Sequence, residues 1–183
     1  MRSHLLHIAA FFAGIIVAPP IDDADRDDIP VIGRPVDLPF SGASGDFIVD
    51  GKAEPTTLAY DESLNFKMTI RATGAFQHGP HALNLAEIKE FADQFYVDPA
   101  PVTLTMPDNR TWVFTYRLKP RSSQVANVPA VPFVFFNPAI RPAERGFQIR
   151  YTLPIPIRIT PSVAIEPALQ PLSDEVYQLD SSP

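Results

Sequence analysis

The chain contains no cysteine among its 183 residues. Disulfide bonds, thiolate metal sites and cysteine nucleophiles are therefore excluded, while the cellular compartment stays open. Basic residues are also few, because 15 Lys and Arg stand against 21 Asp and Glu, for a net charge of −6. A nucleic-acid surface needs clustered Lys and Arg, so this balance argues against a nucleic-acid partner.

The sequence also lacks the short motifs that mark common active sites. It contains no Gly-x-Ser-x-Gly elbow, no His-Glu-x-x-His pair, no P-loop and no dinucleotide fingerprint. His78 and His81 flank Gly79-Pro80 in an expected loop. A zinc site needs three or four ligands, and nothing in the sequence fixes Glu87 or Glu90 beside the two imidazoles. We therefore assign no catalytic residue, no cofactor-binding residue and no metal ligand, and we expect no enzyme.

Two patterns resemble ligand-binding loops only in part. The run Asp23–Asp27 has the spacing that opens a calcium loop, but the required Gly and Glu are replaced by Asp28 and Arg34. Ser41 and Ser44 lie in the glycine-rich stretch "FSGASG". A phosphate cradle requires a helix to follow such a stretch, and the strand-like "DFIVDG" follows instead. We interpret the acidic run as a solvated segment and predict no phosphate site at the serines.

Proline is the residue that the sequence has in excess. The chain has 21 prolines, roughly twice the usual proportion of about 5%. Proline removes a backbone hydrogen-bond donor and breaks helix interiors. Hydrophobic residues still make up 45% of the chain, so a core can form. The composition therefore favours an all-β domain with long connections over a helical one.

Three segments have the patterns of β-strands. Every second residue from Leu64 to Ile70 is apolar and the residues between them are polar, which is typical of a half-buried antiparallel strand. The segment 112–118 repeats this pattern and begins with Trp112, the only tryptophan, which we expect in the core. The segment 133–136 is apolar at every position, which predicts a central strand.

The longest alternating segment is 147–160, in which every odd position from Phe147 to Ile159 is apolar. These odd residues are expected to face the core. Pro154 and Pro156 lie at even positions, so their two missing N–H donors fall on one side of the strand. The segment is therefore predicted to lie at an edge of the sheet, or to break there and change partner.

One short helix is predicted after Asn84. This residue can cap the helix, with Glu87 three residues on as in a capping box. Apolar residues from Leu85 to Phe95 follow at helical spacing. About seven short strands, this crossover helix and no alternation of strands with helices predict an all-β fold. We expect an immunoglobulin-like antiparallel β-sandwich with one short crossover helix.

The predicted sandwich spans residues 45–161, and the flanking segments differ from it in composition. Residues 1–20 carry one arginine and then an apolar run too short for a transmembrane helix, so we expect a signal peptide or an N-terminal anchor. Residues 21–44 are acidic and then rich in Pro, Gly and Ser, which predicts a linker that becomes ordered near Phe40. Residues 162–183 are acidic and proline-rich, and we expect a disordered tail.

Several pieces of the chain, taken in order, resemble one family. They include "GDF", "EPTTLAYDE", "RATG", "YRLKP", "VPAVPFVFFNP" and "PIPIRI". In order and spacing they look like BatD, the oxygen-tolerance (aerotolerance) family of bacterial envelope proteins. The matching positions are Gly45–Phe47, Glu54–Glu62, Arg71–Gly74, Tyr116–Pro120, Val128–Pro138 and Pro154–Ile159.

The resemblance implies immunoglobulin-like domains facing the periplasm and a role as a scaffold. It also implies particular partner proteins, because von Willebrand factor A-type membrane proteins and a MoxR-type ATPase commonly accompany the family. This chain departs from the family in having a single predicted sandwich. It also has no apolar run after residue 161 that could cross a membrane. We therefore expect contact with a membrane only through the N-terminal segment, in the periplasm or cell envelope.

The leading functional expectation is an exported, non-enzymatic scaffold or protein-binding domain. Its edge strand could accept a strand from another envelope protein. The alternative is a carbohydrate- or ligand-binding β-sandwich module, for which Tyr60, Phe76 and Tyr96 are the candidate loop aromatics. An enzyme would need His78 or His81 to lie beside carboxylates.

Overall fold

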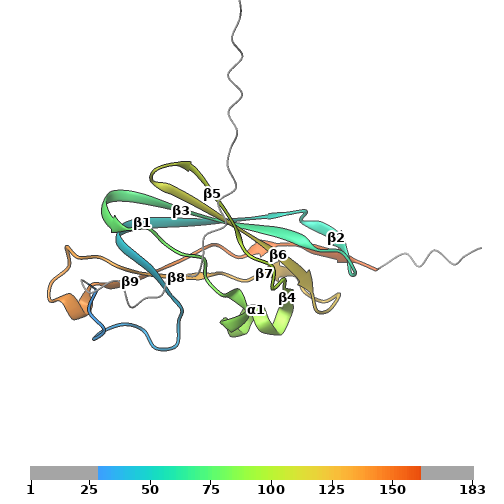
Figure 1. Cartoon of the computed structure of the whole chain (residues 1–183). Helices are drawn as coiled ribbons and strands as arrows, with labels where there is room; N and C mark the ends of the chain where they lie inside the picture. The colour runs from blue at the N-terminus through green and yellow to red at the C-terminus, as the bar shows by residue number, and fades with distance from the viewer. Residues whose placement is uncertain (1–28, 162–183) are drawn as a thin grey trace, which may run out of the picture.

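The chain forms a mostly β structure with one short helix (Figure 1). The computed structural model describes residues 29–161. The predicted signal peptide or anchor at 1–20 and the predicted tail at 162–183 lie outside the described residues, as does the first part of the predicted linker at 21–44. The predicted dominance of β-structure and the single short helix are confirmed.

Most strands belong to one strongly curled, mixed sheet (Figure 1). The strands are β1 (Phe40–Glu54), β2 (Thr57–Ala59), β3 (Leu64–His78), β4 (Phe95–Val97), β5 (Thr103–Asp108), β6 (Thr111–Pro120), β7 (Asn127–Val128), β8 (Pro132–Phe136), β9 (Phe147–Tyr151), β10 (Ile155–Pro156) and β11 (Arg158–Thr160). The sheet order is β4-β6-β3-β1-β8-β9, and β5 also pairs with β6. Two short pairs, β10 with β7 and β11 with β2, complete the β-structure of the described residues.

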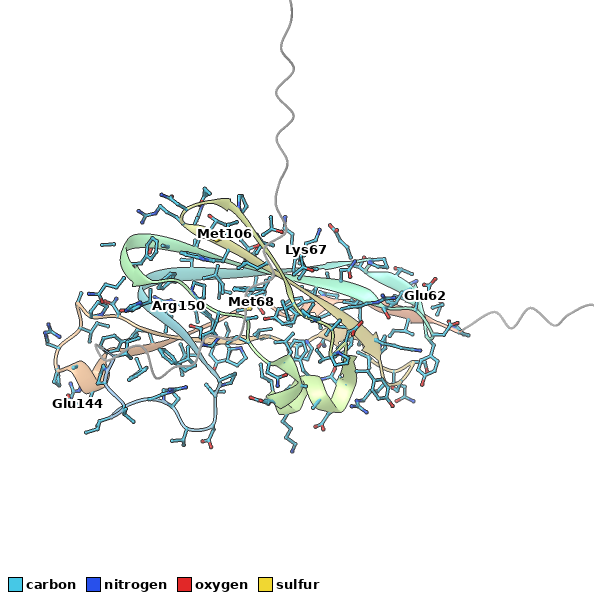
Figure 2. All side chains as sticks on the ribbon, viewed as in Figure 1. Glu62, Lys67, Met68, Met106, Glu144 and Arg150 are labelled. Atoms are coloured by element: carbon cyan, nitrogen blue, oxygen red, sulfur yellow. The ribbon has the colours of Figure 1, made fainter. Side chains whose placement is uncertain are left out.

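The strands β1, β3 and β6 form one layer whose inner face carries the core. β3 pairs antiparallel with β1 on one side and with β6 on the other. The alternate apolar residues from Leu64 to Ile70 are fully buried, as predicted. Figure 2 shows Met68 between the layers and the preceding residue, Lys67, on the outer side. Successive side chains of a strand point to opposite faces, so the alternation places one half of β3 in the core.

The core is built largely from aromatic rings. The ring centroid of Phe47 in β1 lies 6.2 Å from Trp112, 6.0 Å from Phe133 and 5.6 Å from Phe135, each edge-on. Edge-on pairs of this kind contribute about 0.5–1.5 kcal/mol each beyond the area that they bury. Trp112 is 6% exposed and lies in the core, as predicted. Phe47 thereby packs against both β6 and β8 inside the curl of the sheet.

The long strand β1 changes partner along its length. Its first residues pair in parallel with β8, with Phe40 opposite Val134 and Ser44 opposite Phe136, and the strand from Ser44 onward pairs antiparallel with β3. The bulge lies at Gly45, whose φ is 149° and whose added Cβ would lie 2.6 Å from Cβ of Phe76. The expectation of a purely antiparallel arrangement is therefore wrong. The sheet is mixed because β1 pairs antiparallel with β3 and, at its start, in parallel with β8.

The predicted helix is present but interrupted. A 3-10 turn, η2 (Leu85–Glu87), precedes the α-helix α1 (Lys89–Gln94). Asn84 caps the turn, since its side-chain oxygen accepts from the N–H two residues on at 3.2 Å. Ile88 is extended, with φ −86° and ψ 114°, and separates the turn from α1. Within residues 29–161, no helix is long and apolar enough to cross a bilayer.

The alternating segment 147–160 breaks into three strands, as its prolines predict. β9 pairs with β8, β10 with β7 and β11 with β2. The predicted burial of the odd residues is confirmed for Ile157, which is 8% exposed, and is wrong for Ile149 and Tyr151, which are 36% and 57% exposed. The reason is that these two residues of β9 share a face with Val134 of β8, away from the main core.

A smaller apolar cluster covers part of that outer face. The segment before β1 lies over it, and the exposure of Tyr151 shows that this cover does not reach the far end of β9. The arrangement leaves one end of the outer face buried and the other in contact with water. The buried members of the cluster are Phe40, Val134 and Phe136, with Ile29, Leu38 and Phe147 packed against them.

Candidate functional site

The outer edge of β9 is the candidate site. β9 pairs with β8 on one side, and within residues 29–161 no strand pairs with its other side. The N–H of Thr152 donates to the carbonyl oxygen of Val131 at 3.1 Å, so even-numbered residues turn their backbone groups toward β8. Successive residues of a strand turn these groups to opposite sides. The N–H and C=O of Phe147, Ile149 and Tyr151 therefore point to the open side.

Exposed apolar side chains occur at the same positions. The exposed fraction rises from 36% at Ile149 to 77% at Leu153. We call residues 147–153 the β9 edge. Sheet edges are usually protected from pairing by charged residues, prolines or bulges. Only Arg150 is charged in this stretch, and Pro154 comes after it, so the edge is weakly protected.

The opposite end of the sheet is better protected. β5 pairs only with β6 among the described strands, and it contains Pro107 and ends at Asp108. The Asp108 carboxylate accepts hydrogen bonds from the Arg110 N–H at 2.7 Å and the Thr111 hydroxyl at 3.1 Å, which closes the hairpin to β6. Proline and a charged residue both discourage strand pairing. The edge at β5 is therefore less ready to accept a strand than the β9 edge.

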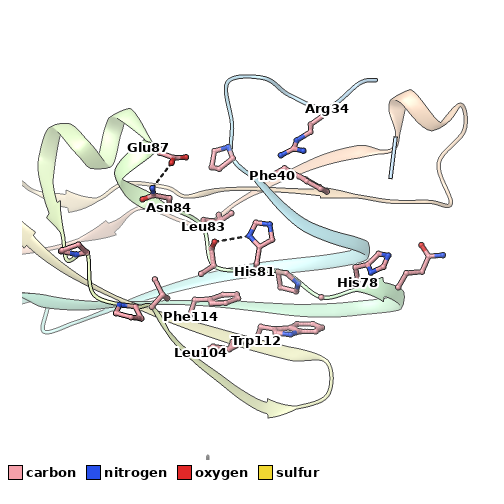
Figure 3. A pocket seen from close by; sticks show the side chains of 18 residues that line it. Arg34, Phe40, His78, His81, Leu83, Asn84, Glu87, Leu104, Trp112 and Phe114 are labelled. Carbon is pink, nitrogen blue, oxygen red and sulfur yellow. Dashed lines mark hydrogen bonds between the residues drawn. The ribbon is translucent and has the colours of Figure 1, made fainter. Parts of the chain in front are cut away.

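The two histidines singled out in the sequence line a groove (Figure 3). His78 ends β3, and His81 lies in the loop that follows, with Nδ1 at 3.2 Å from the carbonyl oxygen of Ala82. Glu87 lines the groove at one end, and Glu90 is not part of its lining. Among residues 29–161, no three His, Asp or Glu side chains come together in a way that could hold a metal ion.

Ser41 and Ser44 are structural residues of β1. Both are fully buried. The Ser41 hydroxyl donates to the carbonyl oxygen of Val134 at 2.6 Å, and the Ser44 hydroxyl donates to the side-chain oxygen of Gln77 at 3.0 Å. These bonds tie the start of β1 to β8 and to β3, just before the bulge. The glycine-rich stretch is therefore the start of a strand.

Two of the three candidate loop aromatics meet at one arginine. The guanidinium of Arg121 lies 3.9 Å from the ring centroid of Tyr96, and the Tyr60 hydroxyl donates to the carbonyl oxygen of Arg121 at 3.1 Å. Tyr60 and Tyr96 are both exposed. Phe76 belongs to β3 and not to a loop, and its ring centroid lies 5.3 Å from that of Trp112. We call Tyr60, Tyr96 and Arg121 the tyrosine cluster.

One ionisable group in the core has a displaced pKa. Burial raises the pKa of Tyr116 above its ordinary value, because the phenolate would lose its contact with water. The N–H of Leu83 donates to the Tyr116 hydroxyl oxygen at 3.0 Å, which lowers the pKa in part. Tyr116 is therefore neutral near pH 7, and its hydroxyl holds the loop after β3 against β6.

Sequence reasoning identifies some of these surfaces and misses others. The open edge at β9 has a signal in the sequence, namely the proline that ends the strand. Arg34 in the groove and Arg121 in the tyrosine cluster have no such signal. Arg34 lies over Phe40, six residues on with no regular element between them, and Arg121 lies over Tyr96, which is far from it in the sequence. Comparisons with family models, with curated proteins and with solved structures found no match for this chain. Function is therefore inferred from the residues themselves.

Proposed function

We propose that this chain is a non-enzymatic domain of the bacterial cell envelope that binds an extended segment of another envelope protein. The observation that carries the proposal is the β9 edge, where open backbone groups and the exposed side chains of Ile149 and Tyr151 coincide. A strand laid along this edge would gain main-chain hydrogen bonds. Its alternate side chains would give the interaction its specificity.

The partner segment should be apolar at alternate positions. Residues that lie across from each other in a sheet share a face, so apolar partner residues would cover Ile149 and Tyr151. Arg150 is exposed and points to the other face, where an acidic partner residue is favoured over a basic one. The partner should also lack proline at the positions whose N–H must reach β9.

The location and the class of partner rest on the sequence. An apolar run follows Arg2, which suits export. The ordered motifs from Gly45 to Ile159 resemble the BatD family, and von Willebrand factor A-type membrane proteins commonly accompany its members. Proteins of that type are therefore the first partners to test. We also propose that the fold is an immunoglobulin-like sandwich. In it, β1 would belong to both layers, because it pairs with β3 and with β8.

Replacement of Ile149 by proline tests the edge directly. Proline at this position removes an N–H that points to the open side and leaves the backbone bonds to β8 in place. Ile149→Thr keeps the N–H and is the matched control. With tagged full chain and envelope solubilised in mild detergent, we expect the wild type to recover a von Willebrand-type protein. Recovery with Ile149→Pro should fall about tenfold or more, and recovery with Ile149→Thr by less.

Circular dichroism of both variants shows whether the strand itself is intact. Recovery of no envelope protein by the wild type would count heavily against the proposal. Equal recovery by the wild type, Ile149→Thr and Ile149→Pro would place the partner on a different surface and overturn the role of the β9 edge.

A second candidate function is carbohydrate binding at the tyrosine cluster. Tyr60 and Tyr96 are 41% and 54% exposed, and Arg121 lies between them with its guanidinium on one ring. Aromatic rings next to a hydrogen-bond donor are common in sites that bind small polar ligands. A glycan array tests this function, with Tyr96→Ala as the loss-of-binding variant. An array without hits would remove it.

A further inference from the structure

The end of the sheet at β9 carries basic residues without an acidic partner in the described chain. Arg141 and Arg145 lie in the connection between β8 and β9, Arg150 lies in β9 itself, and all three are exposed. Within residues 29–161, none of the three forms an ion pair with a carboxylate. Glu144 is the single acidic residue of the segment 137–160. The surroundings of the β9 edge are therefore basic, on a chain whose net charge is −6.

The excess of acidic charge belongs to segments outside the described residues. Residues 29–161 contain nearly equal numbers of acidic and basic residues, whereas residues 162–183 contain four acidic residues and no Lys or Arg. Residues 22–28 are also acidic, but Ala24 is their single apolar residue, so they could not cover the apolar side chains of the β9 edge. The C-terminal segment is therefore the part of the chain that complements this edge in charge and in apolar content.

One stretch of the C-terminal segment has the pattern that the β9 edge requires. Residues 172–182 contain no proline, so each N–H of the stretch can donate to a neighbouring strand. Tyr177 and Leu179 are two residues apart and would share one face of an extended strand, while Asp180 would lie on the other face. The stretch thus offers apolar side chains for Ile149 and an acidic one for Arg150.

We infer that residues 174–180 pair with the β9 edge of the same molecule as an added antiparallel strand. This inference rests on the proposed strand-binding role of the edge, and it identifies an internal competitor for the partner. In the register that pairs Ile149 with Leu179, Tyr151 lies opposite Tyr177, and Asp180 lies diagonally across from Arg150. The β9 strand of a second copy would fit less well, because it would bring two sets of arginines together.

The chain is long enough for this return. β9 and the end of β11 lie at opposite ends of the molecule (Figure 1). Nine residues lead from Tyr151 to Thr160, so the distance between the two is at most about 32 Å. The thirteen residues 161–173 span about 40 Å at the roughly 3.1 Å per residue of an extended, proline-containing chain. A turn after β11 would therefore allow the segment to reach β9.

Amide hydrogen exchange at the β9 edge tests the pairing in the full chain. If residues 174–180 are paired, the N–H groups of Ile149 and Tyr151 donate to them and exchange slowly. Leu179→Pro removes an N–H that would point to β9, and both amides should then exchange at least about tenfold faster. Gln178→Pro is the matched control, because the N–H of Gln178 would point away from β9, and exchange should change less. Equal exchange in the wild type and Leu179→Pro would overturn the inference.

Charge reversal tests the register. Arg150→Glu and Asp180→Arg should each speed exchange of the Tyr151 amide severalfold, because each places like charges near one another. The combined variant rebuilds a pair of opposite sign and should exchange as the wild type does. Arg117→Glu is the matched control without effect, since Arg117 is an exposed arginine of β6, away from this edge. A combined variant that exchanges faster than either single variant would overturn the pairing.

Dilution and partner recovery separate this inference from the proposed function. Pairing within one molecule should give exchange rates that do not depend on protein concentration. Loss of protection on dilution would assign the added strand to another copy and overturn the inference. Leu179→Pro should recover severalfold more envelope partner than the wild type does, because its edge is open, and equal recovery would also overturn the inference. If neither chain recovers a partner while Ile149 stays protected in the wild type, the proposed function fails and the pairing stands.

Discussion

β3 and β9 are both antiparallel strands with apolar residues at every second position, yet their surroundings differ. Phe66 in β3 is 0% exposed, whereas Ile149 in β9 is 36% exposed. β3 has a hydrogen-bonded neighbour on each side and core residues over its inner face. β9 has one neighbour in the described chain and an outer face that is covered at one end only.

The buried apolar residues of β3 stabilise the fold, whereas the exposed apolar residues of the β9 edge are available to a binding partner. The apolar residues of β3 contribute to folding because water is removed from them within the chain itself. The apolar residues of the β9 edge remain in contact with water, and a partner strand could still remove it. Substitutions in the two strands should therefore have very different effects on stability.

The largest effect is expected from Phe66→Ala. The Phe66 ring is fully buried, with centroids 6.1 Å from Phe91 and 6.2 Å from Tyr116. Its removal leaves a cavity and should lower the free energy of unfolding by about 3–5 kcal/mol. Urea unfolding followed by circular dichroism measures this change. A loss below about 1 kcal/mol would show that the β1–β3–β6 layer is not the main source of stability.

A smaller effect is expected from Tyr116→Phe. This variant leaves the buried N–H of Leu83 without its acceptor, which should cost about 1–3 kcal/mol at neutral pH. The matched control is Tyr151→Phe in β9, where the side chain is 57% exposed and no effect above about 0.5 kcal/mol is expected. Urea unfolding of both variants at pH 7 measures the difference, and similar losses would contradict the contrast between the strands.

Tyr116 should also make stability depend on pH in alkaline solution. Its folded pKa is raised, so the folded chain holds this proton more tightly than the unfolded chain does. The contribution is complete below the unfolded pKa of about 10. It is lost at about 1.4 kcal/mol per pH unit as the pH rises toward the folded pKa. The stability difference between the wild type and Tyr116→Phe should therefore shrink above pH 10.

Thr152→Val tests where β9 obtains its attachment. Thr152 is 2% exposed, and its hydroxyl oxygen accepts from the Val131 N–H at 2.8 Å. Its replacement by the isosteric valine should cost about 1–2 kcal/mol, because the N–H of Val131 loses this partner. Thermal unfolding measures the change. A stabilised variant would mean that burial of the extra methyl group outweighs the lost hydrogen bond.

The smallest effect is expected from Ile149→Thr. The side chain is partly exposed, and threonine suits a strand as well as isoleucine does. The free energy of unfolding should change by less than about 0.5 kcal/mol. A loss of 2 kcal/mol or more would show that the outer face of β9 is covered in the folded chain. That result would contradict the conclusion that the apolar face of β9, unlike that of β3, is exposed to water.

Local pattern is enough to predict much of this fold. The alternation in 64–71 and 112–118 identifies β3 and β6, the apolar run 133–136 identifies β8, and Asn84 marks the start of the helical segment. The prolines at the end of β9 predict the break in the last strand. Each of these signals lies within a few residues of the feature that it predicts.

The remaining features depend on partners that are distant in the chain. The parallel pairing of Phe40 with Val134 requires two segments that no short pattern connects. The exposure of Ile149 depends on how far the segment before β1 reaches across the outer face. The groove lined by the two histidines brings Arg34 near residues of β5 and β6, and a surface built from several loops has no periodicity to detect.

The pairing of β11 with β2 has a mechanical consequence. The two strands run in parallel, with Arg158 opposite Thr57 and Thr160 opposite Ala59. Tension applied to the chain beyond Thr160 and resisted through β1 would pull these strands past each other lengthwise. Their hydrogen bonds would then share the load and yield together, whereas a hairpin pulled open from its end yields one bond at a time. A domain held at one end and tethered through the other would resist extension at this point.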